Sequence, residues 1–124
     1  MTHWTSDQLN AIEQTGELHI QPQRADDRLR TPTTVWVVRE GDDLYARSYN
    51  SPNGAWFRTA KASGTGHIRC GGIDQDLTLT PIHDGALNDR IDGAYRTKYA
   101  AASAYVPPMV ADRARAATLK LTLR

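Results

Sequence analysis

Two strand-like runs joined by a short turn constrain the fold of this chain most. Residues 33–39 and 44–49 are dense in Val, Thr, Trp and Tyr, which favour extended backbone. Gly41-Asp42-Asp43 lies between them and supplies the residue types of a β-hairpin turn. The chain is therefore expected to build a sheet around this hairpin.

Apolar and polar residues alternate in four further segments and predict strands there: residues 17–21, 67–70, 76–82 and 117–123. Apolar residues at helical spacing predict one helix between Ser6, the expected N-cap, and Gly16, and another at about residues 88–99. A helical turn is expected at residues 60–63. Six short, mostly antiparallel strands with two helices indicate a mainly β fold, a small barrel with flanking helices.

Composition narrows the class of protein. The 124 residues are expected to form one domain, residues 1–124, and 15 basic against 14 acidic side chains leave no charge surplus for nucleic acid. We expect no membrane partner, because no apolar run approaches the roughly 20 residues that span a bilayer. The N-terminus lacks the pattern of a secretory signal, and Cys70 is the single cysteine, so a cytoplasmic protein is expected.

The order of several short motifs resembles that of a known family. Arg30-Thr31-Pro32, Gly41-Asp42, Ala46-x-Ser48 and Trp56-Phe57 follow one another as in deazaflavin-dependent nitroreductases of the FMN-binding split β-barrel superfamily. The whole chain more closely resembles a bacterial family catalogued as a domain of unknown function. The resemblance implies a small split β-barrel of about six antiparallel strands, an FMN or deazaflavin cofactor and a homodimer. It also implies an oxidoreductase, nitroreductase-like, that acts on a small organic substrate.

Cationic, hydroxyl and amide side chains gather near the ends of the hairpin strands, and such donors together bind anions. The residues expected to bind the cofactor are Arg30, Thr31, Arg47, Ser48, Asn50, Trp56 and Arg58. Trp56 is expected to lie against the cofactor ring, and the arginines are expected to hold its anionic tail. Solvated arginines and a core tryptophan are the alternative interpretation.

Tyr99 and Tyr105 are the candidates for a catalytic role, because a phenol in a pocket can transfer a proton. The alternative is that they pack the closing helix on the barrel. The four histidines form no H-x-x-x-H pair, so no metal site is expected.

Two other functions stay open at this level. The nitroreductases usually carry a Gly-Arg-x-Ser-Gly run before their Arg-Thr-x-Pro motif, whereas residues 23–28 contain no glycine and include Asp26 and Asp27. This difference favours a cofactor-free small-molecule binding or accessory protein. The other alternative is a cofactor-independent enzyme that uses the same pocket, with Tyr99, Tyr105 or a histidine as the proton-transfer group.

Overall fold

The computed structural model describes residues 4–26, 28–48, 55–70 and 72–124. Within these residues the strands, in chain order, are β1 (Leu18–Pro22), β2 (Thr33–Val35), β3 (Val37–Glu40), β4 (Asp43–Arg47), β5 (Thr65–Cys70), β6 (Ile73–Pro81) and β7 (Thr118–Leu123). The helices are α1 (Ser6–Gln14), α2 (Ala55–Ser63), α3 (Gly85–Lys98), the 3-10 helix η1 (Ala100–Tyr105), α4 (Val106–Val110) and α5 (Asp112–Arg115). No helix in the described part is long and apolar enough to cross a membrane.

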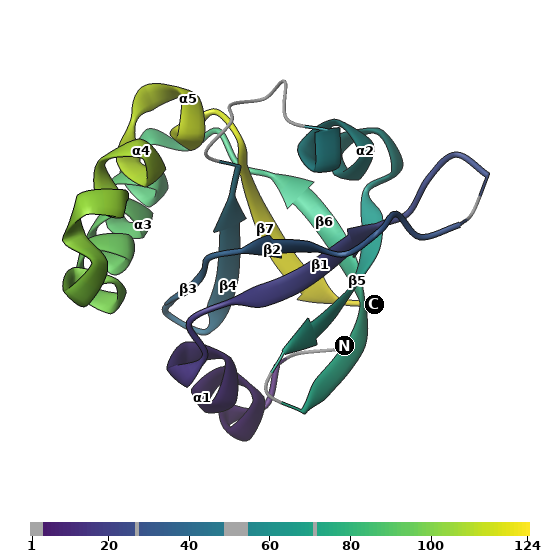
Figure 1. Cartoon of the computed structure of the whole chain (residues 1–124), viewed down its shortest axis with the longest axis horizontal. Helices are drawn as coiled ribbons and strands as arrows, with labels where there is room; N and C mark the ends of the chain where they lie inside the picture. Colours follow the sequence, from purple (N-terminus) through teal and green to yellow (C-terminus); the bar gives the residue numbers. More distant parts are fainter. Residues whose placement is uncertain (1–3, 27, 49–54, 71) are drawn as a thin grey trace.

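All seven strands belong to one antiparallel sheet with the order β2-β1-β5-β6-β7-β4-β3. The two edge strands, β2 and β3, follow one another in the chain with only Trp36 between them. The sheet therefore curls until its edges nearly meet (Figure 1). The predicted mainly β fold with flanking helices is confirmed. The count of about six strands rises to seven because the strand predicted at residues 33–39 breaks at Trp36.

The predicted hairpin forms between β3 and β4. Val37 pairs with Ala46 and Glu40 pairs with Asp43, which leaves Gly41 and Asp42 as the turn. Gly41 has a φ of 63°, a left-handed conformation that glycine adopts without a steric penalty.

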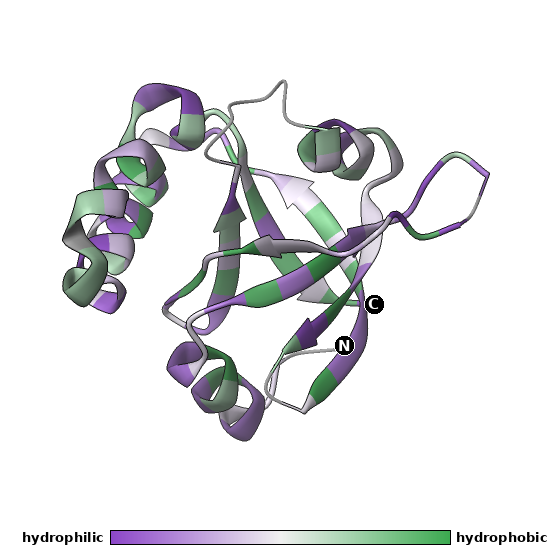
Figure 2. Ribbon diagram, in the orientation of Figure 1, coloured by the Kyte–Doolittle hydropathy of each residue, from purple (hydrophilic) through white to green (hydrophobic). Residues whose placement is uncertain are grey.

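Alternation along the strands separates two apolar clusters, because successive side chains point to opposite faces of a sheet. Val37 and Ala46 lie in the barrel interior, whereas Val38 and Tyr45 face outward and pack under α3. Figure 2 shows hydrophobic and hydrophilic residues succeeding one another along the strands. On the outer face, Val38 and Tyr45 form a second buried cluster with Tyr95, Tyr99 and other residues of the C-terminal helices.

Helices α1 and α2 lie far apart, and both bury apolar residues in the barrel interior (Figure 1). At α1 the N-cap is Thr5 instead of the expected Ser6. The Thr5 hydroxyl accepts from the Gln8 backbone N–H (3.1 Å), and the Gln8 side chain accepts from the Thr5 N–H (2.9 Å). This capping box satisfies two otherwise free donors, and the helix begins one residue earlier than a Ser6 cap would place it. Trp4 fixes the preceding segment by donating to the Leu121 carbonyl (2.9 Å).

Candidate functional site

An open groove of about 680 Å³ lies between α2 and the segment that connects β1 to β2. Its volume falls within the roughly 300–1,000 Å³ of small-molecule sites. The groove is lined by residues of that segment and of one face of α2: Gln23, Arg24, Ala25, Leu29, Arg30, Thr31, Ala55, Arg58, Thr59, Ala62 and Ser63. In Figure 1 this segment projects from the sheet beside α2.

Local structure explains why these side chains meet. After Pro22 the segment folds back on itself, since the Arg24 N–H donates to the Arg28 carbonyl (2.7 Å) and Gln23 pairs with Leu29 in an isolated antiparallel bridge. On the other wall, helical periodicity divides α2 into two faces. Trp56, Phe57 and Ala60 are buried in the barrel interior, whereas the residues of α2 that line the groove lie on its other side.

The groove is electropositive. Three guanidinium groups line it, those of Arg24, Arg30 and Arg58, and none of its described lining residues is acidic. The Arg24 Nε lies 3.9 Å from an Asp26 carboxylate oxygen, and both side chains are exposed, so this pair neutralises little. The Arg58 side chain forms no hydrogen bond or ion pair with any residue in the described ranges. The groove is therefore suited to an anion.

Three hydrogen bonds hold Arg30 at the wall of the groove. Its backbone N–H donates to the Pro22 carbonyl (2.9 Å), and its carbonyl accepts from the Gln21 side-chain amide (3.1 Å). Its Nη1 donates to the Thr59 hydroxyl of α2 (3.2 Å). The Arg30 Nε is buried and has no partner among the described residues, an uncommon state for a buried donor.

The structure brings together three of the seven residues predicted to bind the cofactor: Arg30, Thr31 and Arg58. Asn50 lies outside the described residues. Arg47, Ser48 and Trp56 are described, and none of them lines the groove.

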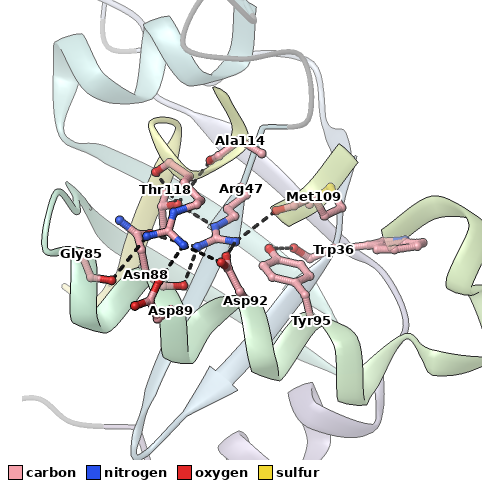
Figure 3. A network of polar contacts seen from close by, with 11 residues as sticks. Trp36, Arg47, Gly85, Asn88, Asp89, Asp92, Tyr95, Met109, Ala114 and Thr118 are labelled. Carbon is pink, nitrogen blue, oxygen red and sulfur yellow. Dashed lines mark hydrogen bonds and ion pairs between the residues drawn. The ribbon is translucent and has the colours of Figure 1, made fainter. Parts of the chain in front are cut away.

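Arg47 lies instead in a buried polar network between β4 and α3 (Figure 3). A guanidinium has five N–H donors, and protein groups accept from all five. The acceptors are the Thr118 hydroxyl (2.8 Å), the Asn88 carbonyl (3.1 Å), the Asn88 side-chain oxygen (2.9 Å), the Met109 carbonyl (3.0 Å) and an Asp92 carboxylate oxygen. No donor is left for a ligand. Arg47 points outward from the sheet, and α3 brings the carboxylate that pairs with it.

Ser48 and Trp56 are also buried. The Ser48 hydroxyl has no partner among the described residues, and the Ser48 backbone N–H donates to the Ala117 carbonyl (3.1 Å). Trp56 is 9% exposed and meets Phe57 edge to face, with ring centroids 6.1 Å apart. The helix predicted from residue 60 begins at Ala55, and its periodicity turns the Trp56 ring into the core. The core interpretation of Trp56 is therefore the one that the structure supports.

The two candidate catalytic tyrosines do not reach the groove. Tyr105 is 69% exposed on η1. Tyr99 is buried, donates to the Gly16 carbonyl (2.8 Å) and stacks on Trp36 with ring centroids 4.0 Å apart. Burial raises the pKa of Tyr99, which opposes proton transfer at neutral pH. Both phenols are placed for packing and surface roles.

His67 lies between two carboxylates. His67 on β5 contacts Asp76 through Nδ1 (2.7 Å) and Asp74 through Nε2, and both carboxylates belong to the neighbouring strand β6. Both carboxylates are exposed. The contacts use opposite sides of the ring, and the described residues include no group of three His, Cys, Asp or Glu side chains that could hold a metal ion.

Sequence reasoning missed most of the α2 wall. Thr59 and Ser63 lie four residues apart and line the groove together with Arg58 and Ala62. Extending the predicted helical turn back to Ala55 would have placed these residues on one face. Arg24 belongs to the charged segment of residues 23–28, and no local pattern distinguished it from the other charged residues there.

Fold and site together define a small, nearly closed antiparallel barrel with a basic groove beside one helix. The chain belongs to a bacterial family described as "Uncharacterized protein conserved in bacteria (DUF2255)", whose sequence profile matches residues 8–121. The expected likeness to a bacterial family of unknown function is thereby confirmed. No curated protein matches the chain significantly.

A solved structure from Bacteroides thetaiotaomicron VPI-5482, described as a "putative 5-nitroimidazole antibiotic resistance protein", has a similar fold. The TM-score is 0.64 at 10% sequence identity, and the alignment covers 99% of this chain and 82% of that one. At this identity the likeness establishes the barrel fold alone.

Proposed function

We propose that this protein binds a small anionic molecule in the groove between α2 and residues 23–31. The observation that carries the proposal is the groove's charge: three guanidinium groups and no carboxylate among its described lining residues. The Arg58 side chain has no protein partner in the described ranges, so its guanidinium is available to pair with a phosphate or carboxylate.

FMN and deazaflavin coenzymes fit this groove in one respect and not in another. Arg30, Thr31 and Arg58 suit the phosphate-bearing tail. The described lining has no aromatic side chain, and Trp56, the expected platform for the ring, lies in the core. Binding of either coenzyme through its tail is our second proposal, and it rests on the order of motifs that resembles deazaflavin-dependent nitroreductases.

Ligand binding separates these functions. Purified protein is titrated with inorganic phosphate, FMN and a deazaflavin coenzyme at constant ionic strength, while thermal melting and tryptophan fluorescence are followed. We expect stabilisation that grows with the logarithm of ligand concentration. Stabilisation by all three probes supports an anion site, and much tighter binding of one coenzyme supports the oxidoreductase.

Matched variants locate the binding. Arg58→Gln is expected to weaken binding without changing the melting temperature of the free protein. Arg113→Gln removes the same charge from the exposed face of α5 and is expected to leave binding unchanged. Equal binding by the two variants, or no shift with any probe, would refute the groove as an anion site.

Sedimentation of the same samples tests the homodimer, which we propose from the family resemblance.

A further inference from the structure

We propose that the ligand of the groove is an organic anion with an aliphatic portion, which lies against Leu29 and the alanines of α2 while the charged group pairs with Arg58. This inference rests on the proposed anion site. It goes further by naming the chemical class of the ligand, a charged headgroup joined to a hydrocarbon chain.

Leu29 is an exposed leucine in the wall of the groove. It is 43% exposed, and with Tyr105 it is one of the two exposed large hydrophobic residues in the described part of the chain. It belongs to neither of the two buried apolar clusters of the described residues. A single exposed leucine is common on protein surfaces, but this one lines a groove. A ligand that covers Leu29 would remove apolar surface from water, which is favourable.

The backbone holds Leu29 in this position. Leu29 pairs with Gln23 in the isolated antiparallel bridge, and the neighbours Arg28 and Arg30 are hydrogen-bonded through their backbones to the other arm of the segment. The place of Leu29 is therefore set without packing of its side chain in a core. A polar residue at position 29 should leave the fold intact.

Helix α2 supplies the other wall and carries a small apolar residue on either side of a cation. Ala55, Arg58 and Ala62 are three and four residues apart, so they share one face of the helix. All three line the groove and are exposed. An anion that pairs with Arg58 therefore has its hydrocarbon chain beside an alanine methyl group, with Leu29 on the opposite wall.

The lining as a whole combines apolar and cationic side chains. Ala25 adds a fourth aliphatic residue to Leu29, Ala55 and Ala62, and these four lie among the arginines of the groove. Small-molecule sites typically join an apolar lining to a few polar groups that fix the ligand. Inorganic phosphate would pair with the arginines and leave the aliphatic residues in water. An anion with a hydrocarbon chain contacts both kinds of side chain, so affinity should rise with chain length.

The test is calorimetric titration with acetate, butanoate and hexanoate, and with inorganic phosphate and butyl phosphate, at constant pH and ionic strength. Leu29→Gln makes one wall polar at similar side-chain length, and Ala62→Gln does so on α2. Arg58→Gln removes the cation. Tyr105→Gln changes the other exposed large hydrophobic residue, which does not line the groove, and is the matched control. The tighter of butanoate and butyl phosphate identifies the headgroup.

We expect the wild-type affinity to rise about twofold for each added methylene, or roughly 16-fold from acetate to hexanoate, because an open groove buries about half of each methylene. Leu29→Gln and Ala62→Gln should each reduce this gain to about fourfold or less. Arg58→Gln should weaken all members of the series by a similar factor. Tyr105→Gln should bind as the wild type does.

The failures are distinguishable. If the wild type binds none of the probes, the anion site itself is refuted. If the wild type binds acetate and hexanoate equally, or if Leu29→Gln keeps the full gain with chain length, the anion site stands and only the inference about the aliphatic portion is overturned. If Leu29→Gln does not fold, the gain measured in Ala62→Gln decides the matter.

Discussion

Replacing Arg47 with methionine tests whether this arginine belongs to the fold or to a ligand site. Its side chain is fully buried and donates to Thr118, Asn88, Met109 and Asp92. Removing one partner of a buried ion pair typically costs about 3–5 kcal/mol. Asp92 keeps a second partner, because Arg115 Nη1 donates to its other oxygen (2.6 Å). We therefore expect a loss near the lower end, about 3 kcal/mol.

Urea unfolding followed by circular dichroism measures this loss. With a slope of about 1–3 kcal/mol per molar urea, the midpoint should fall by about 1–3 M while the slope stays constant. Phosphate binding by the folded variant should match that of the wild type. The double variant Arg47→Met/Asp92→Leu should recover much of the stability, since it also removes the buried carboxylate.

Two results would refute this reasoning. A midpoint that is unchanged in Arg47→Met would mean that the buried network contributes nothing to stability. Loss of phosphate binding at unchanged stability would return Arg47 to the ligand site predicted from the sequence. Arg113→Met is the control for the loss of an exposed arginine charge.

Three further outcomes are expected. Burial lowers the pKa of Lys98 from 10.5 to about 8, so the unfolded chain binds more protons than the folded protein between these two pH values. The free energy of unfolding of the wild type should therefore rise with pH across this window, relative to that of Lys98→Met. Parallel pH profiles of the two proteins in urea unfolding would contradict the shift. A Cβ at Gly66 would lie 2.9 Å from the Gln21 carbonyl oxygen, so Gly66→Ala should lower the melting temperature. A Cβ at Gly93 on α3 would meet no atom within 4 Å, so Gly93→Ala should raise the melting temperature by improving helix propensity. A higher melting temperature for Gly66→Ala than for Gly93→Ala would contradict this packing. Trp56→Ala should lower the free energy of unfolding, measured by urea denaturation, by about 3–5 kcal/mol without weakening phosphate binding. Weakened binding would instead favour the sequence-based prediction that Trp56 lies against a ligand ring.

The fold was largely predictable because its signals are local. Alternation marks the strands, and Gly41-Asp42 lies where the hairpin turns. The break at Trp36 was not predictable, since residues 33–39 read as one continuous strand. In the structure one half of this run pairs with β1 and the other half with β4, at opposite edges of the sheet. The positions of β1 and β4 in the sheet depend on the rest of the chain, so the run alone could not show the break.

The candidate site was predictable only in part, as two arginines illustrate. Arg30 and Arg47 both stand beside hydroxyl residues near strand ends and look alike in the sequence. Their environments differ because α3 places Asp92 and Asn88 over Arg47, whereas Arg30 faces α2 and the groove. Asp92 and Asn88 are distant from Arg47 in the sequence, and Thr59 is distant from Arg30. The local sequence pattern therefore could not show that Arg47 stabilises the fold whereas Arg30 lines the groove.

The position of β7 has a consequence for synthesis on the ribosome. This strand lies between β6 and β4 and is the link between the two halves of the sheet, and Trp4 also bonds to it. Until Leu123 has left the exit tunnel, the nascent chain holds β4 and β6 with unpaired edges, which are prone to aggregation. The barrel can therefore close only after β7 has emerged, and truncation before residue 118 should leave two separate sheet fragments that cellular proteases can degrade.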